Sequence, residues 1–176
     1  MQKNHLYLYL LACCIAAACG KADAVFFEDK STVMKADRTG WSATASSQET
    51  TCETATADLV LDGKTATYWS SQGCPTVLPY PHSITLDMKK AINLVSVEII
   101  ARQNDANGMT KFKMEGSNDS NTWTVLRDNL AFVPTTRTAQ SYPVPSSATW
   151  RYLRVTALEG PIQKAFLSEI EVYTTK

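Results

Sequence analysis

Apolar and polar residues alternate in five segments of the chain: 82–88, 94–101, 110–116, 151–158 and 168–174. A period of two places alternate side chains on opposite faces of a β-strand, so each segment predicts a strand with one buried and one solvated face. The expected buried positions are Ile84, Leu86, Met88, Val95, Val97, Ile99, Phe112, Met114, Leu153, Val155, Ile170 and Val172. By the same pattern, Glu169 and Glu171 are expected to face solvent.

No segment of useful length has the period of an α-helix. Turn-forming residues, such as "GSNDSNTW" at 116–123, separate the expected strands instead. One-sided strands joined by turns form antiparallel sheets with one solvated face. Seven or eight such strands in about 135 residues can bury their apolar faces only by packing sheet on sheet. The pattern therefore predicts an all-β fold, an antiparallel β-sandwich.

The N-terminus has a different character. A lysine is followed by an apolar run from Leu6 to Ala18, which is shorter than the roughly 18 residues of a membrane-spanning helix. Such a segment is typical of a secretory signal peptide. The run ends in "AAACG", which resembles a bacterial lipobox, and in that motif the cysteine, here Cys19, is lipidated. The alternatives are an ordinary signal peptide with an incidental cysteine, or a lipobox at Cys13 with a shorter apolar core.

These features predict three parts: a lipoprotein signal peptide at 1–18, a lipidated N-terminus and tether at 19–38, and a single domain at 39–176. The lipid would anchor the protein in a membrane. The expected location is the outer membrane or cell surface of a Gram-negative bacterium.

Five cysteines are an odd number for an exported protein. Cys13 and Cys14 would leave with the signal peptide, and Cys19 would carry lipid. Cys52 and Cys74 remain, and we expect them to form a disulfide. Closing the loop between them would contribute ~3 kcal/mol to stability.

Charge and composition disfavour several classes of function. The 17 basic and 17 acidic residues are scattered, without the basic stripe that a nucleic-acid partner would require. The expected mature chain has one histidine, His82, too few for a multi-histidine zinc site, and a triad built on it is implausible. The sequence does not exclude a carboxylate pair for glycoside hydrolysis. However, the sandwich takes up the whole domain, so no segment remains to form a catalytic cleft. We therefore expect a protein that is not an enzyme.

Six motifs occur in an order that resembles the discoidin domain, also called the coagulation factor 5/8 C-terminal domain. They are "GWSATASSQET", "LVLDGKTATYWSS", "PHSITLDMKKAINLVSVEIIARQ", "FKMEGSNDSNTW", "RYLRVTA" and "LSEIEVY". The resemblance covers about Thr39 to Tyr173 and is closest to the family 32 carbohydrate-binding modules, especially short versions from gut Bacteroidetes. It implies an eight-stranded jelly-roll sandwich.

The resemblance also implies a structural calcium site in the loop "DGKTATYW". The implied ligands are the Asp62 carboxylate, the Thr67 hydroxyl and carbonyl, the Glu169 carboxylate, and the carbonyls of Leu59, Lys64 and Ser168. Calcium takes six to eight hard oxygen ligands and accepts backbone carbonyls. The alternative is a plain Asp-Gly turn without metal.

For glycan binding, the resemblance points to Arg102 at the end of a strand and to Asn107 shortly after it. A planar guanidinium and an amide suit vicinal hydroxyls. An aromatic face usually completes such a site, and the candidates are Tyr80 and Phe166. Galactose-binding relatives often carry a histidine after the Tyr-Trp pair. Here that segment reads "SSQGCP", so galactose specificity is not implied. The alternative for Arg102 is a solvated residue at the rim.

The leading hypothesis is a non-catalytic, lipid-anchored glycan-binding domain of a bacterial cell envelope. The alternative is a protein-interaction or scaffold subunit of an envelope complex that uses the same loops. Phospholipid recognition is a third hypothesis, which the mainly polar loops "SQETTCETATA" and "NDANGM" disfavour.

Overall fold

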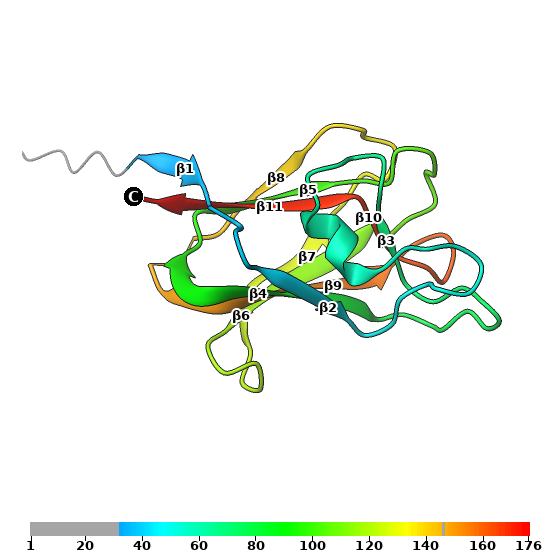
Figure 1. The fold of residues 1–176 in the computed structure, drawn as a ribbon, viewed down its shortest axis with the longest axis horizontal. Helices are drawn as coiled ribbons and strands as arrows, with labels where there is room; N and C mark the ends of the chain where they lie inside the picture. Colours follow the sequence, from blue (N-terminus) through cyan, green and yellow to red (C-terminus); the bar gives the residue numbers. More distant parts are fainter. Residues whose placement is uncertain (1–31, 146) are drawn as a thin grey trace, which may run out of the picture. The chain divides into compact units, whose positions relative to one another are not determined.

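The computed structural model describes residues 32–145 and 147–176, and Figure 1 shows two β-sheets packed face to face. One sheet has the strand order β2-β4-β9-β6-β7 and the other β1-β11-β5-β8, while β10 and β3 form a small third sheet. The strands in the described ranges are β1 (Val33–Lys35), β2 (Ser42–Ala45), β3 (Trp69–Ser70), β4 (His82–Asn93), β5 (Ser96–Ile100), β6 (Lys111–Ser117), β7 (Thr124–Ala131), β8 (Gln140–Pro143), β9 (Thr149–Glu159), β10 (Phe166–Leu167) and β11 (Glu169–Thr175). All pairings are antiparallel, which confirms the predicted sandwich.

The core lies between the two large sheets. The apolar positions of the five alternating segments are buried there, except Val95, which is half-buried. Trp69 contributes the largest buried side chain and is 1% exposed, and its indole Nε1 donates to the Ser47 carbonyl at 3.0 Å. A buried indole needs such an acceptor, so this bond fixes the ring and the start of the loop that precedes it.

One short 3₁₀ helix, η1 (Ala57–Leu61), is present in the described ranges. It buries Ala57 and Val60 and delivers Asp62 to the edge of the sandwich. Within residues 32–145 and 147–176, no helix has the length and apolar character needed to cross a membrane.

The domain begins before Thr39, where the sequence pattern placed its start. Met34 of β1 pairs with Thr174 of β11, and the Ala36 N–H donates to the Val172 carbonyl at 2.8 Å. This part of the expected tether is therefore an edge strand of the four-stranded sheet. The expected signal peptide at 1–18 and Cys19 lie outside the described residues.

Two glutamates expected in solvent are buried. Glu169 is 2% exposed and Glu171 is 7% exposed, although both alternate with core residues as predicted. Arg38 covers them: its Nη1 lies 2.9 Å from Glu169 Oε2 and its Nη2 lies 3.1 Å from Glu171 Oε1. The expectation of solvent exposure was wrong because the N-terminal segment and the loop after η1 lie over this face of β11.

A disulfide joins Cys52 to Cys74, as predicted. The two loops that carry these cysteines also share one carboxylate. Glu49 Oε1 accepts the N–H groups of Thr51 and Cys52 at 2.7 and 3.0 Å, and Oε2 accepts those of Gly73 and Cys74 at 2.7 and 2.8 Å. These four bonds lower the pKa of Glu49 to about 2, and the bond from the Cys52 N–H has the largest effect. The carboxylate therefore holds both loops together beside the disulfide.

We predict that Glu49→Gln destabilises the domain at neutral pH, because the amide NH₂ would face backbone N–H groups that need an acceptor. The wild-type pKa is lower in the folded state than in the unfolded chain, so the carboxylate stabilises the fold above about pH 4.5. That contribution is lost as the pH falls from about 4.5 towards about 2. Urea unfolding at several pH values should therefore show a stability difference between wild type and variant that shrinks on acidification.

Glu159→Gln is the matched control, since Glu159 is exposed and its carboxylate pairs with Lys111 at the surface, at 3.0 Å. Its effect should be small, because exposed ion pairs contribute little. A Glu49→Gln variant as stable as wild type at pH 7 would contradict the role of this carboxylate.

Candidate functional site

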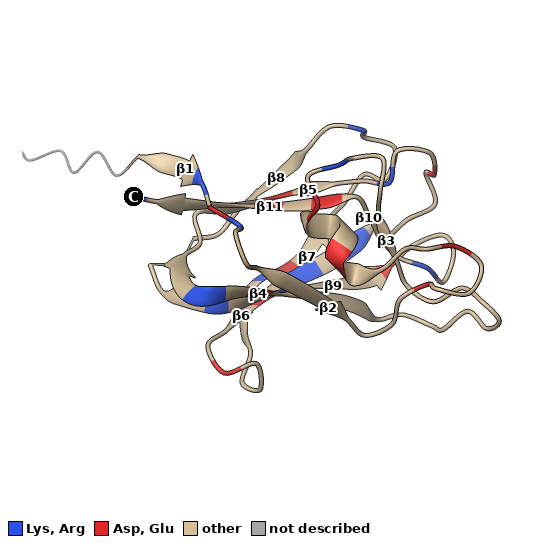
Figure 2. Cartoon of the chain, viewed as in Figure 1, with Lys and Arg blue, Asp and Glu red and all other residues tan. Residues whose placement is uncertain are grey.

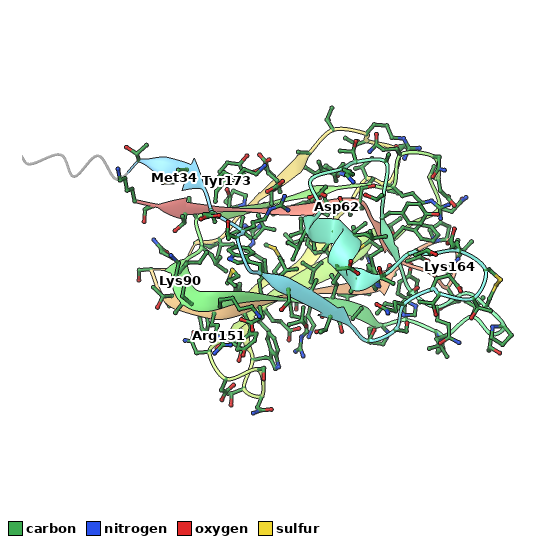
Figure 3. The ribbon with its side chains drawn as sticks, viewed as in Figure 1. Met34, Asp62, Lys90, Arg151, Lys164 and Tyr173 are labelled. Carbon is green, nitrogen blue, oxygen red and sulfur yellow. A yellow bond between two sulfur atoms is a disulfide. The ribbon has the colours of Figure 1, made fainter. Side chains whose placement is uncertain are left out.

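Long loops gather at one end of the sandwich, the end where Figure 3 places Lys164 and, near it, the disulfide, opposite the C-terminus. Arg102 lies there, two residues after β5 ends. The pairing of the nearby strands explains which residues surround Arg102. Ile100 pairs with Glu169, and Phe166 of β10 pairs with Ser70 of β3. These pairings bring the ends of β5 and β10 together beside Tyr68, which immediately precedes β3.

Arg102 is held by aromatic rings and oxygen atoms. Its guanidinium carbon lies 3.8 Å from the ring centroid of Tyr68 and 5.0 Å from that of Phe166. Nε donates to Asn104 Oδ1 at 2.8 Å, and Nη2 lies 3.5 Å from Glu53 Oε2. The side chain is only 14% exposed. Cation–π contacts and these bonds together fix the plane of the guanidinium.

Glu53 connects the cations and the tyrosine of this cluster. It accepts a hydrogen bond from the Tyr68 hydroxyl at 2.6 Å and lies 3.8 Å from Lys164 Nζ. Burial first, and then the bond to Glu53, raise the pKa of Tyr68 to about 12. The hydroxyl therefore stays protonated and keeps donating to Glu53. Figure 2 shows that acidic and basic segments are interspersed around this end and over both sheets.

A second arginine fixes the backbone of the loop that carries Arg102. Arg137 Nη1 donates to the carbonyl of Arg102, to that of Asp105 at 3.0 Å and to that of Pro134 at 3.2 Å. Asn107 lies on the same loop and is exposed, and its backbone N–H and Nδ2 both donate to Asp105 Oδ1, at 2.8 and 3.0 Å. Arg102 and Asn107 thus lie on one braced loop, as the resemblance implied. Their role in binding stays a prediction.

The two expected aromatic platforms, Phe166 and Tyr80, differ in exposure. Phe166 is 2% exposed, because Arg102 and Lys164 lie over its ring. The Tyr80 hydroxyl donates to the Lys164 carbonyl at 2.6 Å, and its ring packs on His82 with centroids 5.0 Å apart. The ring of Phe166 therefore presents no broad open face to a sugar, whereas the ring of Tyr80 is half-buried and its role stays a prediction.

Sequence reasoning missed Tyr68 and Glu53. Tyr68 precedes the buried Trp69 and so points to the opposite face, a signal that alternation could have supplied. Glu53 carries no comparable local signal, since its partners are far away in the sequence.

A second cluster surrounds Asp62, at the position labelled in Figure 3. Asp62 Oδ2 accepts the Thr67 hydroxyl at 2.8 Å, and the same hydroxyl lies 2.9 Å from the Lys64 carbonyl. Burial acts to raise the pKa of Asp62, but bonds from Thr67 and the Lys64 N–H outweigh it, so this pKa lies below its usual value. The Thr67 hydroxyl is thus within hydrogen-bonding distance of two other expected oxygen ligands, the Asp62 carboxylate and the Lys64 carbonyl.

Glu169 closes this cluster from β11. Its Oε1 accepts the N–H groups of Gly63 and Lys64 at 2.7 and 3.0 Å, and Arg38 binds Oε2. Burial raises the pKa of Glu169 despite Arg38, and its interaction with Asp62 adds to the rise. Two neighbouring carboxyl groups are stabilised by sharing a proton or a cation. Asp62 and Glu169 thus interact with each other, and Arg38 already places one positive charge beside Glu169.

The expected ligands are carboxylate, hydroxyl and carbonyl oxygens, which are the types of ligand that calcium binds. Leu59 belongs to η1 shortly before Asp62, and Ser168 directly precedes Glu169, so both expected carbonyls come from segments flanking the two carboxylates. Within the described ranges, no group of three or more His, Cys, Asp or Glu side chains could hold a metal. A calcium ion here would therefore depend on backbone carbonyls and a hydroxyl, which calcium accepts and zinc does not favour.

The architecture is that of the galactose-binding-domain-like β-sandwiches, with a cluster of charged and aromatic residues on loops at one end. The F5/8 type C domain matches residues 42–170, and the chain therefore belongs to this family. Among curated proteins, a sialidase from Micromonospora viridifaciens is 30% identical over 134 residues, which are 74% of this chain and 20% of the sialidase. The chain thus spans about a fifth of that relative's length.

Several similar solved structures are carbohydrate-binding modules. The family 32 module of Clostridium perfringens NanJ, in complex with galactose, has a TM-score of 0.71 and 21% identity, covering 81% of this chain and 99% of that chain. The module CBM32-3 from a family 31 glycoside hydrolase of the same organism has a TM-score of 0.68 and 27% identity, covering 81% of this chain and 95% of that chain.

Proposed function

We propose that this domain is a non-catalytic glycan-binding module whose site is centred on Arg102. The observation that carries the proposal is the fixed guanidinium, held between Tyr68 and Phe166 at the loop end of the sandwich. The likeness to family 32 modules supports the same class of ligand.

The geometry suits hydroxyl recognition. A guanidinium has five N–H donors, and those of Arg102 not directed at Asn104 and Glu53 can meet two adjacent sugar hydroxyls. The amide of Asn107 on the same loop offers a donor and an acceptor. Because Arg137 and the two rings already fix this loop, little conformational entropy is lost on binding.

A protein partner is a second candidate, favoured by exposed apolar residues at the same end. Val77 and Leu78 are 46% and 38% exposed, and Ile162 is 38% exposed. Their loops adjoin, since the Tyr80 N–H donates to Gln163 Oε1 at 3.2 Å. Such side chains suit the centre of a protein interface.

We predict that Arg102→Ala abolishes detectable glycan binding. Shallow single-sugar sites bind with Kd of ~0.1–1 mM. Losing a charged donor to bound hydroxyls costs roughly 1.5–3 kcal/mol, which takes binding beyond calorimetric detection. The measurement is a glycan array with the purified protein, followed by titration calorimetry with any glycan found.

Arg151→Ala is the matched control, because Arg151 also lies over a tyrosine, Tyr152 at 4.9 Å, and pairs with a carboxylate, Asp87 at 3.0 Å. It lies away from the loop end (Figure 3) and should leave binding unchanged. If Arg102→Ala binds the glycan as well as wild type does, the site lies on another surface. If the array is negative and only protein partners bind, the second candidate replaces the first.

We further propose that calcium binds at the Asp62 loop as a structural ion, through Asp62, Thr67, Glu169 and the carbonyls of Leu59, Lys64 and Ser168. The ion would neutralise the two neighbouring carboxylates and hold the loop against β11. The convergence of the Asp62, Thr67 and Lys64 oxygens supports this proposal.

Chelation with EDTA should accordingly lower the melting temperature of wild type, because an ion that binds only the folded state stabilises it. Asp62→Ala should have a lower melting temperature that no longer responds to EDTA. Asp58→Ala, an exposed acid in η1, is the control and should respond as wild type does. An unchanged melting temperature of wild type in EDTA would mean that the loop is a metal-free turn.

Finally, we propose that Cys19 carries a lipid that anchors the domain at the outer membrane or cell surface of a Gram-negative envelope. The motif "AAACG" at the end of the short apolar run supports this. Metabolic labelling with a palmitate analogue should mark wild type and Cys13→Ala but not Cys19→Ala. Labelling of Cys19→Ala equal to wild type would exclude lipidation at this residue.

A further inference from the structure

The candidate site contains a second cation, Lys164, near Arg102. The Lys164 Nζ lies 5.3 Å from the centroid of the Phe166 ring, and the Arg102 guanidinium carbon lies 5.0 Å from the same centroid. Lys164 comes from the segment between β9 and β10, whereas Arg102 follows β5. Two segments that are distant in the sequence thus place their positive charges around one ring.

A single carboxylate, that of Glu53, serves both cations. Its Oε2 lies 3.5 Å from Arg102 Nη2, and its Oε1 lies 3.8 Å from Lys164 Nζ. Both distances exceed the about 2.7–2.9 Å of a close charge-assisted hydrogen bond. The closest donor to Glu53 is instead the Tyr68 hydroxyl, at 2.6 Å. Glu53 therefore offsets only one of the two positive charges, and it makes no close bond to either cation.

Both cations have nitrogen atoms that a ligand can reach. Arg102 Nε and Nη2 bond to Asn104 and Glu53, whereas Arg102 Nη1 and Lys164 Nζ have no hydrogen-bond partner among residues 32–145 and 147–176. Neither atom is among the buried unpartnered atoms of these ranges, so both have accessible surface. A molecule at the surface can therefore accept hydrogen bonds from the guanidinium and from the ammonium.

The position of the ammonium is restricted by its surroundings. A Cβ at Gly73 would lie only 2.6 Å from Lys164 Nζ and 2.7 Å from its Cε, so the end of the side chain lies against the Gly73 backbone. That backbone is itself fixed, because the Gly73 N–H donates to Glu49 Oε2 at 2.7 Å. A cation that is already held in place loses little conformational entropy when it binds a ligand.

The other carboxylates near this cluster are already compensated. Glu49 is buried, and four backbone N–H groups offset its charge. Asp105 Oδ1 accepts two bonds from Asn107, and Arg137 binds the same segment through the Asp105 carbonyl. The accessible part of the cluster thus has two cations and one carboxylate, Glu53. Its unfilled hydrogen-bonding capacity is mainly that of positively charged donors, which bond most strongly to an anionic acceptor.

We propose that the Arg102 site prefers acidic sugars, with the sugar carboxylate bound by Arg102 Nη1 and Lys164 Nζ. A neighbouring sugar hydroxyl would donate to Glu53 Oε1. This inference rests on the proposed function, because it names the class of glycan that the same site takes. Lys164 is then the residue that determines specificity. The second positive charge that it supplies is offset by a ligand carboxylate and not by a neutral sugar.

The experiment is an NMR titration of the isotope-labelled protein at pH 7 with three matched pairs of sugars: galactose and galacturonic acid, glucose and glucuronic acid, and mannose and mannuronic acid. The members of a pair have the same ring and differ only at C6, where a carboxylate replaces the hydroxymethyl group. The backbone amides of Arg102 and Asn107 report on the site. At least one uronic acid should bind about tenfold or more tightly than its neutral partner, the effect of one additional hydrogen bond between charged groups.

Salt provides a test of the cause in wild type. The preference for the uronic acid should decrease when the salt concentration rises from about 0.1 M to about 1 M, because the screening length falls from about 10 Å to about 3 Å. Binding of a neutral sugar should change little over this range. A preference that does not respond to salt would contradict a role of the two positive charges.

Lys164→Gln removes the charge and keeps a similar length. It should weaken binding of the uronic acid by about tenfold or more. Lys90→Gln is the matched control, because it changes the net charge equally at an exposed residue of the opposite end of the domain (Figure 3), and it should leave the preference unchanged. Uronic acid binding as tight in Lys164→Gln as in wild type, or weakened equally by both variants, would overturn the inference.

The inference and the proposed function can fail separately. If neutral sugars shift the Arg102 and Asn107 signals and bind as tightly as their acidic partners, the site binds glycans without the proposed preference. If none of the six sugars shifts these signals, the preference for acidic sugars is refuted, and the glycan array decides whether the site binds glycans at all.

Discussion

The loop end of this domain depends on one carboxylate, that of Glu49. Its two oxygens accept four backbone N–H groups from two loops that are distant in sequence. A buried carboxylate is unfavourable without such donors, and each N–H would be unsatisfied without the carboxylate. The arrangement fixes the loop that also carries Glu53. Glu53 in turn binds Tyr68, Arg102 and Lys164. The positions of these side chains in the candidate site therefore depend on the loop that Glu49 fixes.

Glu169 has an equivalent function at the edge of the sandwich. It joins the loop after η1, through the Gly63 and Lys64 N–H groups, to the N-terminal segment, through Arg38. The two carboxylates differ in one respect. Hydrogen bonds lower the pKa of Glu49 to about 2, whereas burial raises the pKa of Glu169. Backbone N–H groups bind both oxygens of Glu49, whereas Glu169 binds two backbone N–H groups through Oε1 and the guanidinium of Arg38 through Oε2.

The sequence predicted the sandwich and its core because strand periodicity is local, and cysteine counting predicted the disulfide. It placed Glu169 in solvent wrongly, because alternation identifies a face but not what covers that face. It missed β1 as a strand, since three exposed residues carry no alternating signal. The resemblance located Arg102, yet Tyr68 and Glu53 escaped notice. Their contacts depend on how β3 pairs with β10, a long-range register that no single segment encodes.

Strand β4 relates the two ends of the domain. His82 at its start contacts the Gln163 carbonyl at 3.1 Å near the loop end, and the Asn93 Nδ2 at its end donates to Thr175 Oγ1 at 3.2 Å, close to the C-terminus. A strand of this length spans roughly 35–40 Å at about 3.3 Å per residue. A glycan bound by Arg102 would therefore lie at the end of the sandwich remote from the C-terminus (Figure 1).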